Sequence, residues 1–152
     1  MKNCNLDMFP VGYHTFHKDQ RLNANLNMLY SFGILSREQL EDIGRQIPDL
    51  ERWTTLFTRL GNESEQSGDT LRAAFCYYSA MFYTSFTVQT SGDVLSKRDL
   101  YEKSRRMFDL YYSDDDDLKY MQIPFGSFYL PVYFSAQESP KGTIVLFGGY
   151  TT

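Results

Sequence analysis

The apolar pattern of this chain changes its period once, at four consecutive aspartates at positions 114–117. Before them, hydrophobic residues recur three and four positions apart, which is the spacing of one face of an α-helix. After them, the pattern has the alternating and continuous apolar runs of β-strands. The sequence therefore predicts an α+β chain, with a helical domain over residues 1–113 and strands over residues 118–152.

Local signals divide the first part of the chain into helices. The first helix is predicted from about residue 16, and Gly33 suits its C-terminal end. Its buried face is an apolar stripe that includes Leu22, Leu26 and Leu29. The run from Ser36 to Gln39 has the form of a capping box and begins a second helix. Pro48 ends that helix, because the residue before a proline disfavours the helical conformation.

Three more helices are predicted by the same kind of signal. Asp49 can cap a third helix, and Gly68 followed by Asp69 provides a stop and a new cap. The third and fourth helices, which reach about residue 88, form an antiparallel pair with small residues between aromatic ones. A last helix is predicted over residues 97–112. The pair has no second copy about 34 residues away, so a helical solenoid is not indicated.

The second part of the chain predicts a β-hairpin and a further strand. Gly126 and Ser127 suit a two-residue type II′ turn. Pro124 and Pro131 lack a backbone N–H, so parts of the hairpin should lie at a sheet edge. Residues 143–147 are almost wholly apolar, as in a strand buried on both faces. An alternative is that this segment pairs with the hairpin in a small three-stranded sheet.

Composition excludes several classes of protein. The net charge is −4 with no long basic stripe, so nucleic acid is not expected as a partner. No apolar stretch approaches the roughly 18 residues of a membrane-spanning helix, and the N-terminus lacks the apolar core of a signal peptide. Cys4 and Cys76 lie far apart and suggest no disulfide framework. We therefore expect a soluble, cytoplasmic protein with no membrane partner.

The other potentially reactive side chains are better explained by structural roles than by catalysis or metal binding. His14 and His17 could bind a metal with Cys4 or Asp19, but no second cluster supplies the remaining ligands, so no metal is predicted. The aspartate run lacks the spaced ligands and glycine of a calcium loop and reads as a solvated linker. Cys76 lies among aromatic residues and reads as a core residue, because an activated thiolate needs a basic neighbour. No cofactor is predicted.

Four stretches carry a likeness to a known family. They are residues 23–33, the helix around Trp53 that leads to residues 72–80, residues 123–134, and residues 143–150. Together they resemble a family of α/β-hydrolases with an N-terminal helical domain, which includes dihydropseudooxynicotine-hydrolase-like and fermentation–respiration-switch-like proteins. The resemblance implies that the helices form a cap or dimerisation region. It also implies that the hairpin and residues 143–147 are the first three strands of the hydrolase sheet.

The resemblance further implies part of an oxyanion hole in the turn after residue 147. The amide of Tyr150 would donate to the developing charge, and Gly148 and Gly149 would shape the turn. In the family an acidic residue often follows the aromatic residue, whereas this sequence has Thr151.

The catalytic triad of the family is absent from this sequence. No G-x-S-x-G motif occurs, and the only histidines, His14 and His17, precede every candidate nucleophile. We therefore expect an N-terminal fragment of a serine hydrolase that acts on an ester, amide or activated C–C bond, and that is inactive alone. The complete protein would take a small-molecule substrate and form a homo-oligomer. The alternative is a non-enzymatic helical module for protein interaction or dimerisation.

Overall fold

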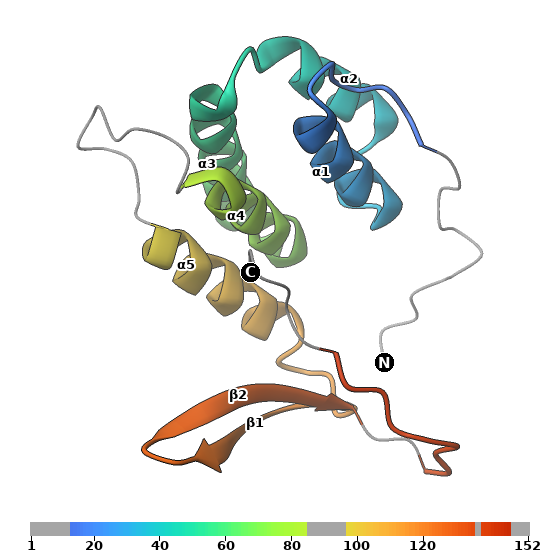
Figure 1. The fold of residues 1–152 in the computed structure, drawn as a ribbon, viewed down its shortest axis with the longest axis vertical. Helices are drawn as coiled ribbons and strands as arrows, with labels where there is room; N and C mark the ends of the chain where they lie inside the picture. The colour runs from blue at the N-terminus through green and yellow to red at the C-terminus, as the bar shows by residue number, and fades with distance from the viewer. Residues whose placement is uncertain (1–12, 85–96, 136–137, 147–152) are drawn as a thin grey trace. The chain divides into compact units, whose positions relative to one another are not determined.

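A computed structural model describes residues 13–84, 97–135 and 138–146, and it shows helices followed by an antiparallel hairpin (Figure 1). The α+β class predicted from the sequence is confirmed. The chain divides into two compact units, a helical unit and a second unit that contains the hairpin. The elements are α1 (Gln20–Ser31), α2 (Arg37–Gln46), α3 (Leu50–Gln66), α4 (Thr70–Thr84), α5 (Lys97–Tyr111), β1 (Leu118–Phe125) and β2 (Phe128–Ser135).

The predicted start of the first helix near residue 16 is wrong, because α1 begins at Gln20. The carboxylate of Asp19 caps the helix by accepting the Arg21 N–H at 2.9 Å. The amides of Phe16 and His17 instead donate to Asn23 Oδ1, at 2.7 and 3.0 Å. These bonds hold residues 13–17, hereafter the arm, in a non-helical path along α1.

Glycine ends two of the helices as predicted. Gly33 has φ +66° after α1, and the amide of the next residue donates to the Leu29 carbonyl at 3.0 Å. Gly68 has φ +80° after α3, and the Asp69 amide donates to the Ser64 carbonyl at 2.9 Å. Both are Schellman motifs, in which a left-handed residue lets the chain satisfy the last helical carbonyls. Each motif turns the chain directly into the next element.

The predicted starts of α2 and α3 are also confirmed. Ser36 and Gln39 form a reciprocal capping box at the start of α2. Ile47, which precedes Pro48, has an extended backbone and ends that helix. Asp49 then accepts the Arg52 N–H at 2.8 Å and begins α3. Local hydrogen-bond chemistry therefore sets the helix boundaries in this region.

One apolar core fills the helical unit. α3 and α4 pack against each other along their length, and α5 packs on α4. Trp53 is fully buried, and its indole N–H donates to the Ser79 carbonyl at 2.8 Å. Further along the antiparallel pair, a Cβ at Gly61 would lie 2.6 Å from the Tyr77 ring. The core includes Leu22, Leu26, Leu29, Leu40, Phe57, Ala73, Ala80, Leu100 and Met107.

Gly44 makes a second close approach in the helical unit. A Cβ at this position of α2 would lie 1.9 Å from the carbonyl oxygen of Phe16. The backbone of the arm therefore passes directly over α2, at a distance that only glycine permits. Neither Gly44 nor Gly61 was identified from the sequence, because each lies against a residue that is distant along the chain.

The hairpin forms with the predicted turn. Gly126 has φ +59°, and Ser127 does not have a positive φ, which is the pattern of a type II′ turn. Phe125 and Phe128 close the turn as directly paired residues. In this register Pro124 and Pro131 fall at pairs that exchange no ladder hydrogen bonds, so their ring nitrogens face the two outer edges. The hairpin therefore accommodates both prolines without losing a cross-strand bond.

The two faces of the hairpin differ in composition, and both are uncovered. The register puts the phenylalanines and most of the aliphatic residues, namely Met121, Ile123, Phe125, Phe128, Leu130, Val132 and Phe134, on one face together with Lys119. The other face carries Tyr120, Tyr129, Tyr133 and the two prolines. All residues of both strands are exposed except Leu118 and Val132, which are half-buried.

The predicted third strand does not form over residues 143–146. These residues have no strand pairing, and Ile144, Val145 and Leu146 are 86%, 75% and 89% exposed. The apolar composition predicted a strand buried on both faces, and in the described residues this segment is neither paired nor buried. A strand also needs a hydrogen-bonded neighbour, however, and the described residues supply none to this segment. Phe147 lies outside the described residues.

Candidate functional site

The predicted oxyanion residues Gly148, Gly149 and Tyr150 lie outside the residues that the structure describes. The segment that leads to them, residues 143–146, is exposed and unpaired. Their role therefore stays a prediction from the resemblance. Polar groups that the structure does bring together are found in the helical unit.

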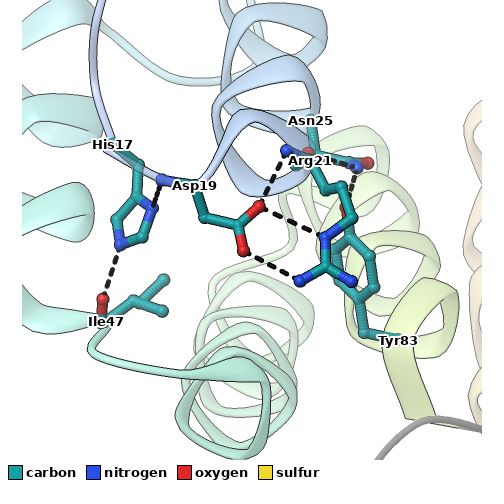
Figure 2. Close-up of polar contacts among 6 residues, drawn as sticks. All are labelled: His17, Asp19, Arg21, Asn25, Ile47 and Tyr83. Atoms are coloured by element: carbon teal, nitrogen blue, oxygen red, sulfur yellow. Dashed lines mark hydrogen bonds and ion pairs between the residues drawn. The ribbon is translucent and has the colours of Figure 1, made fainter.

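A line of polar contacts crosses the helical unit from the junction of α2 and α3 to α4 (Figure 2). His17 lies at one end, where its Nε2 is 2.8 Å from the Ile47 carbonyl oxygen. Its Nδ1 accepts the Asp19 N–H at 2.9 Å. The Asp19 carboxylate then pairs with the Arg21 guanidinium at 2.9 Å. The line thus joins the arm, the start of α1 and the end of α2.

Asn25 completes this line at α4. Its side-chain amide donates to the Tyr83 hydroxyl at 2.7 Å, and both residues are buried. Burial raises the pKa of Tyr83, and the Asn25 hydrogen bond opposes that rise. At the exposed part of the line, the Arg21 guanidinium lowers the pKa of Asp19 to about 2. Asp19 is therefore a carboxylate at neutral pH, and Tyr83 is a neutral phenol.

Two more asparagines of α1 hold the arm. Asn27 accepts the His14 N–H at 2.8 Å and donates to the His14 carbonyl, also at 2.8 Å. Asn23 donates to the same carbonyl at 3.0 Å. The side chains of Asn23 and Asn27 therefore replace the backbone partners that the arm lacks. The alternation of asparagine at positions 23, 25 and 27 was the available signal, because asparagine is unfavourable inside helices without such a role.

A second polar cluster ties α3, α4 and α5 together. The Tyr77 hydroxyl donates to Glu65 Oε2 at 2.6 Å and lies 2.7 Å from Asn62 Oδ1. Lys103 places its ammonium 4.8 Å from the centre of the Tyr77 ring. Burial and the Glu65 carboxylate both raise the pKa of Tyr77. The cluster therefore links the three helices, and its polar groups supply one another's hydrogen-bond partners.

Cys76 is not an activated nucleophile. It is fully buried, and this burial raises its pKa to about 12, with Arg72 acting weakly in the opposite direction. A nucleophilic cysteine instead needs a lowered pKa and access to substrate. The structure therefore agrees with the core reading of Cys76.

The possible metal ligands of the sequence do not gather. In the part of the chain that the structure describes, no group of three or more histidine, cysteine, aspartate or glutamate residues could hold an ion. Both ring nitrogens of His17 are already bonded to backbone groups. The His14 ring packs edge-on against Tyr30, with ring centroids 4.9 Å apart. Cys4 lies outside the described residues.

Two hollows on the surface of the described helices are lined mainly by charged and polar residues. One lies on α5 and includes Arg105 and Asp109, which form an ion pair at 3.6 Å. Another lies at the start of α3 and includes Asp49 and Arg52. None of the helices in the described ranges is long and apolar enough to cross a lipid bilayer.

Comparison with known proteins adds no relative: no protein-family model, no curated protein and no solved structure matches the chain.

Proposed function

We propose that this chain is the N-terminal portion of a serine α/β-hydrolase that acts on an ester, amide or activated C–C bond. The observation that carries the proposal is the uncovered hairpin. Phe125 and Phe128 are both 59% exposed at its tip, and the apolar face behind them is open along both strands. A two-stranded hairpin is marginal in water by itself. The larger sheet and helices of a hydrolase would cover both of its faces.

The exposed segment at residues 143–146 supports the same proposal. Ile144, Val145 and Leu146 form a continuous apolar run, and such runs are typical of strands buried in parallel sheets. In the proposed hydrolase this segment is the third strand of the sheet. The turn after it then brings the Tyr150 amide to the substrate carbonyl.

The chain contributes positioning and charge stabilisation to the proposed reaction. A serine encoded beyond this sequence attacks the substrate, and a histidine moves the proton. The Tyr150 amide, on a turn shaped by Gly148 and Gly149, donates to the negative charge that develops. The helical unit covers the substrate site or joins two copies of the protein. A small molecule is the substrate in this proposal, and a homo-oligomer is the expected assembly.

Nucleotide sequence beyond the codon for Thr152 tests the proposal directly. We expect the reading frame to continue with G-x-S-x-G, then an acidic residue and a histidine. The extended protein should react with a fluorophosphonate probe at the motif serine, whereas the 152-residue chain should not. A continued frame without the motif and the histidine would refute the proposal.

A glycine substitution tests the oxyanion turn in the extended protein. Gly149→Val should slow probe labelling by about 100-fold, since loss of one oxyanion donor costs about that much. The matched control is Gly142→Val, because a side chain at Gly142 meets nothing within 4 Å. Equal labelling rates in the two variants would remove the assigned role of the turn.

The alternative function, a non-enzymatic helical interaction module, has less support. In the described part of the helical unit the large exposed hydrophobic residues are Tyr13 in the arm, Phe32 at the end of α1, and Tyr101 and Leu110 at separated positions of α5. They do not form the continuous apolar face that such a module needs. Light scattering that shows a stable dimer of the helical unit alone would favour this alternative.

A further inference from the structure

His17 is held by two backbone groups of opposite hydrogen-bonding type. The Asp19 amide can only donate, and it lies 2.9 Å from Nδ1. The Ile47 carbonyl can only accept, and it lies 2.8 Å from Nε2. The observed position therefore requires a neutral imidazole with its hydrogen on Nε2. These partners fix the tautomer of the ring without any other assumption.

We propose that His17 is a pH-sensitive latch, which when neutral links the Asp19 amide at the start of α1 to the Ile47 carbonyl at the junction of α2 and α3, and which releases the Asp19 amide on protonation. A proton on Nδ1 would place two N–H donors 2.9 Å apart, at the Asp19 amide. The imidazolium must therefore leave at least one of its two partners.

The carboxylates nearest to His17 and Ile47 in sequence already accept other hydrogen bonds. Both carboxylate oxygens of Asp19 already accept from Arg21. Lys18 and Arg21 add positive charge on the same segment, and the positive end of the α1 dipole also disfavours a cation here. The charges near Ile47 are likewise engaged, as Asp42 with Arg45 and as Asp49 with the Arg52 amide. Among the described residues, His17 forms no ion pair with a carboxylate.

The latch connects parts that are far apart in sequence. The bond from His17 to Ile47 spans 30 residues and reaches the extended residue between α2 and α3. The arm next to it is held by Asn23 and Asn27 and passes over Gly44. Protonation therefore breaks the contact with the Asp19 amide first, while Nε2–H can still donate to the Ile47 carbonyl and the asparagine bonds still hold the arm. The expected change is local and reversible.

Histidine ring NMR on the full 152-residue chain tests the latch. At about pH 7.5 the ¹⁵N shifts of His17 should report the Nε2–H tautomer, with Nδ1 unprotonated. Between about pH 7.5 and pH 5, the hydrogen-exchange protection factor of the Asp19 amide should fall by about tenfold. An Nδ1–H tautomer at the higher pH, or an unchanged protection factor, would overturn the proposal.

Two histidine variants separate the latch from general acid effects. His14→Gln is the matched control, because the His14 ring makes aromatic contacts with Phe16 and Tyr30. It should keep the pH-dependent protection of the Asp19 amide. His17→Gln should lose that dependence, since its side chain does not titrate. The same pH dependence in His17→Gln would contradict the proposal, and the tautomer measurement stands even if this variant folds poorly.

Discussion

The helical unit and the hairpin contain similar aromatic side chains but differ in how far these side chains are buried. In the helical unit, Trp53 and Phe57 are fully buried in one core, and capping side chains or glycines set several of the helix boundaries. In the hairpin, Phe125 and Phe128 are more than half exposed, although their turn and register are well defined. Local sequence signals thus specify both regions, but only the helical unit buries what its sequence supplies.

The comparison separates two requirements of folding. Hydrogen-bond geometry and turn chemistry can be completed within a few residues, as at Gly33 and Gly126. Burial of an apolar face needs a second surface, and this is usually distant in sequence. The helical unit has that second surface in its own helices. The hairpin needs one from elsewhere, which is the physical basis of the proposed function.

The largest expected difference between the two regions is in the cost of removing an aromatic ring. Trp53→Ala should lower the free energy of unfolding by about 3–5 kcal/mol, because it leaves a cavity and removes the bond to Ser79. Phe125→Ala should change it by less than about 1 kcal/mol, since the ring is exposed. Urea denaturation followed by far-UV circular dichroism measures both. A large loss in Phe125→Ala would mean that the hairpin is already buried in solution.

Two glycine substitutions test the same comparison and should change the free energy of unfolding by less. Gly44→Ala should destabilise the helical unit by about 2–3 kcal/mol, because the new methyl group collides with the Phe16 carbonyl. Gly142→Ala should be neutral, since it meets nothing within 4 Å. Thermal denaturation of the two variants gives the difference. If Gly44→Ala were as stable as the parent, the close passage of the arm over α2 would be wrong.

Alkaline pH should weaken the helical unit through Tyr77. Its pKa is raised in the folded chain, so above about pH 10 the unfolded chain loses this proton first. The free energy of unfolding is therefore unaffected by this group below that pH and falls above it. Tyr77→Phe removes the titration, so its stability should decline less steeply with pH. Parallel slopes in urea titrations of parent and variant would show that the phenol is not protected.

The smallest expected effects distinguish two serines inside the helical unit. The Ser104 hydroxyl donates to the Ala74 carbonyl at 2.9 Å, so Ser104→Ala should cost about 1 kcal/mol. The Ser79 hydroxyl is buried without a hydrogen-bond partner, so Ser79→Ala should be neutral or stabilising by up to about 1 kcal/mol. Chemical denaturation resolves a difference of this size. A clear loss in Ser79→Ala would reveal a partner for its hydroxyl, such as a buried water.

Much of the fold could be predicted from sequence because its boundaries are set locally. The capping box at Ser36, the stop at Pro48 and the type II′ turn at Gly126 each follow from a few adjacent residues. The start of α1 was misjudged because the helical pattern was extended back to Phe16, whereas the amides of Phe16 and His17 bond to Asn23. That contact depends on a side chain reaching back from the helix, which periodicity does not register.

The candidate site could be predicted less well. The close approaches at Gly44 and Gly61 depend on Phe16 and Tyr77, which no local pattern connects to them. One of the two ring bonds of His17 likewise reaches Ile47, which is 30 residues away. The failure of residues 143–146 to form a strand has the same origin, since composition indicates a need for burial but does not supply the neighbour. The oxyanion turn at Gly148, Gly149 and Tyr150 stays a prediction.

The position of Trp53 gives the molecule a built-in optical probe. It is the single tryptophan of the sequence, and its indole is sealed between Phe57 and Tyr83. Its emission should therefore be blue-shifted while the helices are assembled, and should move to longer wavelength only when they separate. Binding of an added strand or partner to the hairpin should leave this emission unchanged. Tryptophan fluorescence can thus report whether the helices remain intact while binding to the hairpin is measured by another method.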